Sequence, residues 1–137
     1  MVNAAGETVG THQGLPLYTV GQRRGLGLAA AEPLYVTRLD PAHNTVVVGP
    51  RHAALRATFD VERVNWMCPP PVQTVPTTVQ IRYRHQPVAA AIHPQAPDRA
   101  HVVLQEPQFA VTPGQAAVFY NGDTVIGGGW ITQNTAE

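Results

Sequence analysis

The apolar residues of this chain recur mainly at every second position, which is the spacing of a strand with one buried and one solvated face. The clearest run covers residues 79–84, where Val79 and Ile81 alternate with Gln80 and Arg82. The 12 glycines and 13 prolines among 137 residues leave little room for long helices. We therefore expect an all-β protein.

The expected strands fall into two groups on either side of a short segment at residues 50–55, which is predicted to contain a helical turn. The first group has strands at residues 17–20, 34–39 and 45–49, with a turn at 40–44. The second has strands at residues 58–66, 79–84, 88–93, 101–105, 115–120 and 124–131, with an irregularity near Arg63 and a tight Asn121-Gly122 turn. The sequence thus predicts two domains, a small β domain at residues 1–56 and a β-barrel or sandwich at residues 57–137.

Charge and composition argue against several classes of protein. The nine basic residues, all arginine, equal the nine acidic residues in number, so general positive charge cannot hold nucleic acid to this chain. Apolar runs stay far below the ~18–20 residues of a membrane-spanning helix, and the N-terminus lacks the pattern of a signal peptide. We expect a cytoplasmic protein with no membrane partner.

The sequence also lacks a recognisable catalytic or metal-binding pattern. Its six histidines are dispersed, and neither a phosphate loop nor a dinucleotide fingerprint is present. Cys68 is the lone cysteine, and the prolines that follow it leave no helix N-terminus to activate its thiol. We expect no catalytic residue and no metal site in this chain.

Two arginine-containing segments remain as candidates for contact with RNA. Arg23 and Arg24 stand among glycines at residues 21–27, where guanidinium groups on an open backbone suit phosphates or base edges. A solvated turn explains this segment equally well. Arg82 and Arg84 flank Tyr83, and guanidinium groups beside a ring can bind RNA. Alternation, however, predicts that Tyr83 points into the core.

Short motifs follow one another along the chain in a characteristic order. They are GTHQG at residues 10–14, YTVGQRRGLG at 18–27, EPLYV at 32–36, NW at 65–66, IRYR at 81–84, AVTPGQAAVFY at 110–120 and GGG at 127–129. This ordered set resembles the C-terminal portion of the tRNA-specific 2-thiouridylases. The resemblance implies a small central β domain followed by a C-terminal β-barrel similar to those of elongation factors.

The resemblance further implies that the chain is part of a longer, ATP-dependent enzyme that thiolates the wobble uridine of tRNA at C2. In that family an N-terminal domain binds ATP and carries both catalytic cysteines, one of which receives sulfur as a persulfide. The part present here is therefore expected to be inactive alone and to hold no cofactor, and Cys68 lies outside the family's catalytic positions. Its expected partners are tRNA, the enzyme's own N-terminal domain and a sulfur-donor protein.

The family's tRNA contacts carry over to Arg82 and Tyr83 of the IRYR motif and to Gln115 of the TPGQ motif. This assignment competes with the inward orientation that alternation predicts for Tyr83. A non-catalytic module that docks a protein, such as a sulfur donor, is the alternative function. Salt dependence separates the two, because RNA binding weakens steeply with salt.

The role of the glycine-flanked arginine segment is predicted from its charge. No acidic residue occurs between Thr8 and Ala31, so we expect Gln22, Arg23 and Arg24 to contact tRNA or the catalytic domain.

Overall fold

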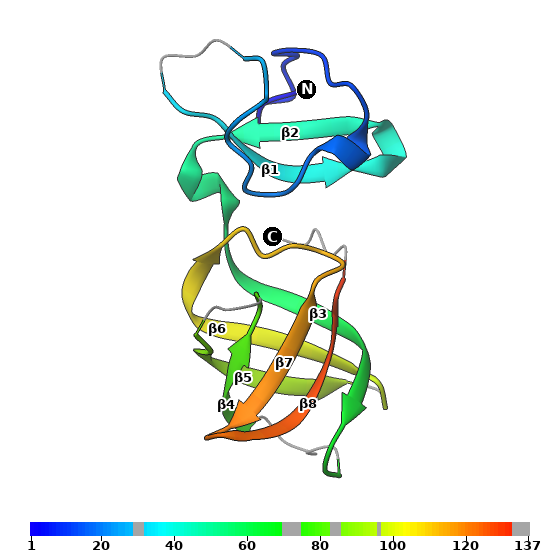
Figure 1. Cartoon of the computed structure of the whole chain (residues 1–137), viewed down its shortest axis with the longest axis vertical. Helices are drawn as coiled ribbons and strands as arrows, with labels where there is room; N and C mark the ends of the chain where they lie inside the picture. The colour runs from blue at the N-terminus through cyan, green and yellow to red at the C-terminus, as the bar shows by residue number, and fades with distance from the viewer. Residues whose placement is uncertain (29–31, 70–74, 83–85, 96, 133–137) are drawn as a thin grey trace. The chain divides into compact units, whose positions relative to one another are not determined.

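The structure is a computed structural model that describes residues 1–28, 32–69, 75–82, 86–95 and 97–132 (Figure 1). The chain divides into two compact units, one formed by Met1–Leu55 with Phe109–Val111 and the other by Arg56–Gln108 with Thr112–Glu137. The sequence places Phe109–Val111 in the second domain, whereas the structure groups this segment with the first unit. There the amide of Ala110 donates a hydrogen bond to the carbonyl oxygen of Ala54 at 3.0 Å.

The first unit is built on an antiparallel hairpin, as the sequence predicts. Strands β1 (Tyr35–Asp40) and β2 (Thr45–Gly49) are joined by the short 3-10 helix η2 (Pro41–His43). A left-handed Asn44 (φ 48°) closes the turn, a conformation that asparagine tolerates better than most residues.

Residues from irregular segments complete the core of the first unit against this hairpin. The buried core cluster consists of Met1, Tyr18, Leu26, Val36, Val46 and Val48. The strand predicted at residues 17–20 is wrong, because Leu15–Leu17 form the 3-10 helix η1 instead. Pro16 lacks the amide that a ladder needs, and the segment places Tyr18 in the core while Leu17 is 65% exposed.

The second unit is a closed six-stranded antiparallel barrel (Figure 1), which confirms the all-β fold and the predicted barrel. A 3-10 helix, η3 (Arg51–Ala54), precedes it at the place where a helical turn is predicted. The strands are β3 (Leu55–Trp66), β4 (Val75–Gln80), β5 (Val88–Gln95), β6 (Arg99–Phe109), β7 (Ala116–Asn121) and β8 (Thr124–Ile131). Their order around the barrel is β3-β6-β5-β4-β7-β8, and pairing of β8 with β3 closes it.

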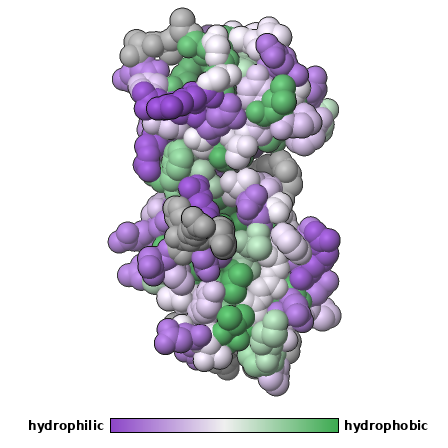
Figure 2. All heavy atoms as spheres, viewed as in Figure 1, coloured by the Kyte–Doolittle hydropathy of each residue, from purple (hydrophilic) through white to green (hydrophobic). Residues whose placement is uncertain are grey.

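Alternating positions of these strands supply the barrel core. The fully buried side chains include Val61, Val79, Ile92, Val102 and Phe119. The outer surface mixes polar and apolar side chains on the face shown in Figure 2. Among the described segments, no helix has the length and apolar character needed to cross a membrane.

Two irregularities concern the candidate residues. The register of β3 against β8 shifts between Glu62 and Asn65, which confirms the irregularity predicted near Arg63. The strand predicted at residues 79–84 has wrong limits as far as Arg82, since β4 covers Val75–Gln80, and residues 83–84 lie outside the described residues. Its last pair with β5 is Val79–Val88, so the strand stops where its hydrogen-bonding partner begins. Alternation within one strand does not show where the neighbouring strand begins or ends.

Candidate functional site

Two of the predicted RNA-contacting residues lie at one end of the barrel. Strands β4 and β8 end there and β7 begins there (Figure 1), and we call this end the rim. The register pairs Gln80 with Val118, so Arg82, two residues beyond β4, and Gln115, one residue before β7, both belong to the rim. Tyr83 lies outside the described residues.

A chain of hydrogen bonds holds the backbone of Arg82 against the barrel. The hydroxyl of Tyr120 donates to Oε1 of Gln80 at 3.1 Å, and Nε2 of Gln80 donates to the carbonyl oxygen of Arg82 at 3.1 Å. Arg82 itself is half-buried. Its position therefore depends on side chains of both β4 and β7.

A tight turn presents Gln115 at the rim. The amide of Gln115 donates to the carbonyl oxygen of Thr112 at 3.2 Å, with Pro113 and a left-handed Gly114 (φ 88°) at the two central positions. This arrangement is typical of a type II turn, which requires a positive φ at its third residue. Ile131 of β8 anchors the turn, because its carbonyl oxygen accepts from the amide of Gly114 at 2.8 Å and its amide donates to the carbonyl oxygen of Gln115 at 2.9 Å. The Gln115 side chain is exposed.

Trp130, which no sequence motif singles out, lies at the same rim. It pairs in register with Ala116 of β7 and with Glu62 of β3. Its side chain is 44% exposed, and the guanidinium carbon of Arg63 is 5.9 Å from its ring centroid. The signal was present in the sequence, since alternation from the apolar Ile131 turns Trp130 outward.

The second candidate segment, residues 21–27, forms a loop beside the hairpin of the first unit, and we call it the arginine loop. Its start is paired with β1, because the amide of Gly21 donates to the carbonyl oxygen of Val36 at 2.7 Å and the amide of Val36 donates to that of Gln22 at 2.9 Å. The amide side chain of Gln22 is used within the loop, accepting from the amide of Thr19 at 3.0 Å and donating to the carbonyl oxygen of Arg24 at 2.8 Å. Gln22 therefore holds the shape of the loop.

Arg23 and Arg24 are both exposed. Across the described part of the chain, neither guanidinium forms a salt bridge. Their charges are thus available to a partner with negative charge.

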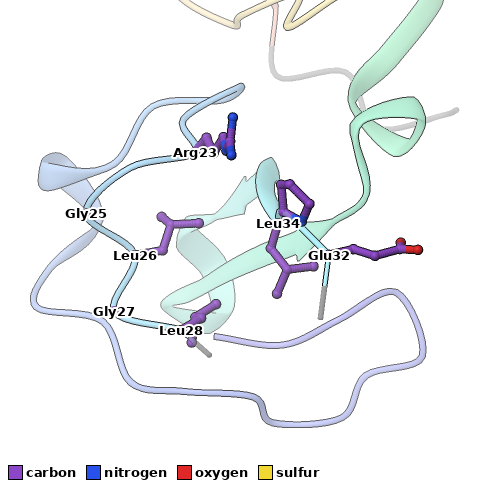
Figure 3. Close-up of a pocket in the computed structure, with 8 residues that line it drawn as sticks. Arg23, Gly25, Leu26, Gly27, Leu28, Glu32 and Leu34 are labelled. Atoms are coloured by element: carbon purple, nitrogen blue, oxygen red, sulfur yellow. The ribbon is translucent and has the colours of Figure 1, made fainter. Parts of the chain in front are cut away.

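An open pocket of about 420 Å³ lies on the inner side of the arginine loop (Figure 3). Figure 3 shows Arg23 on one side, the side chain of Glu32 pointing away, and leucine side chains between them. The lining consists of Arg23, Gly25, Leu26, Gly27, Leu28, Glu32, Pro33 and Leu34. These residues provide one guanidinium over an apolar surface, with no nucleophile or carboxylate pair for catalysis.

Two histidine–aspartate pairs are present, with Nδ1 of His101 2.6 Å from Oδ1 of Asp60 and Nδ1 of His43 2.9 Å from Oδ2 of Asp40. Within the described residues, no group of three or more histidine, cysteine, aspartate or glutamate side chains could hold a metal ion. Cys68 is exposed, and its thiol donates a long hydrogen bond of 3.9 Å to the carbonyl oxygen of Ile126. The geometry favours binding through exposed arginine, amide and aromatic side chains.

Comparison with known proteins identifies the family of this chain. A family model described as a tRNA methyl transferase PRC-barrel domain matches residues 1–50, and one described as an aminomethyltransferase beta-barrel domain matches residues 56–131. The chain is 53% identical over 133 residues to the tRNA-specific 2-thiouridylase MnmA of Thermosynechococcus vestitus and 48% identical over 131 residues to that of Geotalea uraniireducens. This chain belongs to the tRNA-specific 2-thiouridylase family.

The alignments cover nearly all of this chain but only part of each relative. The alignments include 96% of this chain but only 36% and 35% of those two MnmA proteins, so the chain spans little more than a third of the relatives' length. The resemblance to the 2-thiouridylases that the motifs indicate is therefore confirmed. The roles of Arg82, Tyr83, Gln115 and the arginine loop stay predictions.

Proposed function

We propose that this chain is the tRNA-recognition part of an ATP-dependent 2-thiouridylase that thiolates the wobble uridine at C2. The observation that carries the proposal is the meeting of Arg82 and Gln115 at one barrel rim, although they come from different strand ends. These are residues onto which the family's tRNA contacts fall. Family membership supports the substrate, because the relatives are named as tRNA-specific enzymes.

The two side chains would make complementary contacts. The guanidinium of Arg82 suits a phosphate oxygen, and the amide of Gln115 can both donate to and accept from a base or ribose. Tyr83 would add a ring for stacking in the same motif. Contacts of this kind position an RNA mainly through its backbone and shape.

We assign the arginine loop to contact with tRNA or with the N-terminal catalytic domain. Exposure of Arg23 and Arg24, and the bonds by which Gln22 shapes the loop, support this assignment. A loop fixed by its own hydrogen bonds loses less conformational entropy when its charged side chains bind.

The chemistry itself would belong to the remainder of the protein. ATP binding, the catalytic cysteines and the persulfide sulfur are assigned to an N-terminal domain, with a sulfur-donor protein as a further partner and the cytoplasm as the location. This chain alone would then be inactive. It would bring the anticodon region of tRNA to the reacting groups.

Titration of the chain with unmodified tRNA bearing a wobble uridine tests the proposal. Affinity should fall with rising salt, and Arg82→Ala should weaken binding by about tenfold, which is typical of a lost charge-assisted contact. The variant should also lower the salt slope by about one. Arg38→Ala is the control for lost positive charge, since Arg38 lies on β1 of the first unit, where its Nη1 is 3.6 Å from a carboxylate oxygen of Asp40.

Two results would contradict the proposed tRNA recognition. If the folded chain does not bind tRNA even at low salt, direct recognition by this part is wrong. Salt-insensitive binding to a sulfur-donor protein would then support the docking module. Equal losses in the Arg82 and Arg38 variants would show that the effect reflects net charge and not the rim.

A further inference from the structure

Trp130 is the largest apolar side chain exposed on the barrel. It is 44% exposed, while its neighbour Ile131 is only 3% exposed. Its cross-strand partner on β7, Ala116, has a side chain too small to cover an indole. Part of the indole therefore remains open at the rim, although the guanidinium carbon of Arg63 lies over the ring at 5.9 Å from its centroid. Gln115 directly precedes Ala116, the residue that pairs with Trp130.

The backbone beside Trp130 is shaped to place an arginine there. Arg63 occupies the bulge of β3 with a φ of 52°, a left-handed conformation that is uncommon for a residue other than glycine. Strained backbone of this kind is concentrated at binding and catalytic sites. Arg63 is exposed, and its guanidinium carbon lies 5.9 Å from the Trp130 ring centroid.

Gly129 makes this arrangement possible. A Cβ atom at that position would lie 2.5 Å from the carbonyl oxygen of Glu62 and 2.8 Å from Cγ1 of Val61. The two strands can therefore approach closely at the bulge only because residue 129 has no side chain. Bulges commonly redirect a side chain next to a functional site.

The chemistry around the indole favours a nucleotide over an apolar protein surface. Neither cross-strand partner of Trp130 is a large apolar residue, since one is Ala116 and the other is Glu62. A tryptophan at the centre of a protein–protein interface is usually surrounded by packed residues that exclude water. A planar base needs only the ring face, and Arg63 beside it suits a phosphate, whereas Glu62 disfavours an anion on its own side.

We propose that Trp130 and Arg63 form a stacking site for an unpaired nucleotide of RNA. The base lies on the exposed indole, and the guanidinium of Arg63 binds the adjoining phosphate. This inference rests on the proposed function, because Gln115 directly precedes Ala116, the strand partner of Trp130. The stacking site would extend the tRNA surface of the rim from β7 across β8 to β3.

The test is a tRNA titration of the chain monitored by tryptophan fluorescence. Binding should quench the emission of the wild-type chain, and Trp130→Phe should remove most of this quenching, because the other tryptophan, Trp66, packs against Phe119. Trp130→Ala should weaken tRNA binding by about tenfold, the effect expected for one lost stacking contact. Val125→Ala is the control, as Val125 is an exposed apolar residue near the start of the same strand.

Two further arms make the test specific. A fully paired RNA duplex offers no unpaired base, so Trp130→Ala should leave its affinity unchanged. Arg63→Gly removes the guanidinium while keeping a residue that accepts the positive φ. It should weaken tRNA binding and lower the salt slope by about one without lowering the thermal midpoint.

The outcomes separate the two proposals. If Arg82→Ala weakens tRNA binding but Trp130→Ala does not, the stacking site is wrong and the proposed function stands. Equal losses from Trp130→Ala and Val125→Ala, or equal losses for tRNA and duplex, also overturn the stacking site. Failure of the folded wild-type chain to bind tRNA at low salt overturns both proposals.

Discussion

In the barrel each of six strands is hydrogen-bonded to two neighbours, whereas in the first unit a single hairpin supports a long irregular segment. The barrel core comes from alternating positions on regular strands. The core of the first unit combines hairpin residues such as Val36 with Tyr18 and Leu26 from loops. Hydrogen bonds between neighbouring strands therefore stabilise the whole barrel. The first unit depends more on a few core residues outside its hairpin.

This difference extends to the candidate sites. The rim residues are positioned by strand register and by turns anchored on neighbouring strands. The arginine loop depends on the side-chain amide of Gln22 and on a close approach at Gly21. Substitutions should thus act through lost core volume in the barrel and through lost local geometry in the first unit.

The largest effect is expected from Phe119→Ala in the barrel. Phe119 is fully buried and its ring centroid is 5.8 Å from that of Trp66. Loss of the ring should lower the free energy of unfolding by about 3–5 kcal/mol. Denaturant unfolding followed by tryptophan fluorescence reports this unit alone, because both tryptophans lie in it. Phe119→Leu should cost less, and a loss below about 1 kcal/mol in the alanine variant would show that the core is not held by volume.

A smaller effect, confined to the first unit, is expected from Gly21→Ala. Gly21 has a φ of 92°, and a Cβ there would lie 2.6 Å from Cβ of Ala110 and 3.1 Å from Cε2 of Phe109. Strain and overpacking together should cost about 2–3 kcal/mol. Hydrogen exchange of the amides of residues 1–55 would measure the change.

Gly27→Ala is the matched control for that measurement. Gly27 also has a positive φ, 69°, but a Cβ there would meet no atom of a non-adjacent residue within 4 Å, so only the backbone cost of about 1 kcal/mol should remain. Equal effects at the two glycines would mean that the close approach of Gly21 to Phe109 and Ala110 contributes nothing.

The smallest effect is expected at the hairpin turn of the first unit. The carboxylate of Asp40 accepts a hydrogen bond from Nδ1 of His43 at 2.9 Å and lies 3.6 Å from Nη1 of Arg38. The hydrogen bond from His43 is the main reason that the pKa of Asp40 is below its ordinary value of 3.8. A carboxyl with a lower pKa in the folded state stabilises it above the ordinary pKa and stops doing so as pH falls through the folded value.

Asp40→Asn should therefore slightly increase exchange in residues 35–49 at pH 7, and the difference from wild type should shrink below pH ~3.8. Asp123→Asn, in the exposed turn between β7 and β8, is the control and should leave this exchange unchanged. If the exchange difference between Asp40→Asn and the wild type persists at acid pH, it arises from altered turn geometry and not from the lost carboxylate charge.

The parts that sequence patterns predicted well are those where local pattern and pairing coincide. Alternation predicted the hairpin and the barrel. The tight turn predicted at Asn121-Gly122 is present one residue later, because Asn121 pairs with Thr124 and the two turn residues are Gly122, with a φ of 61°, and Asp123. The bulge at Arg63 was visible as a break in alternation. In these segments the residues that alternate in the sequence are also the residues that pair with a neighbouring strand.

The remaining errors arise where tertiary contacts decide. Residues 17–20 are apolar enough for a strand, but Leu17 ends the 3-10 helix Leu15–Leu17 and Tyr18 packs into the core from an irregular segment. The end of β4 depends on where β5 begins, which its own sequence does not encode. Alternation in β8 shows that Trp130 faces outward, but its proximity to Arg63 depends on the pairing of β8 with β3, which neither segment shows alone.

Closure of the barrel by β3 and β8 has a consequence for how this unit can meet other molecules. A closed barrel has no unpaired strand edge, so a partner cannot extend the sheet by adding a strand of its own. The same closure protects the unit from edge-to-edge aggregation. Recognition must rely on outward side chains and connecting turns, which can be exchanged without disturbing the ladder. Partner preference at the barrel can thus diverge among relatives while the scaffold stays the same.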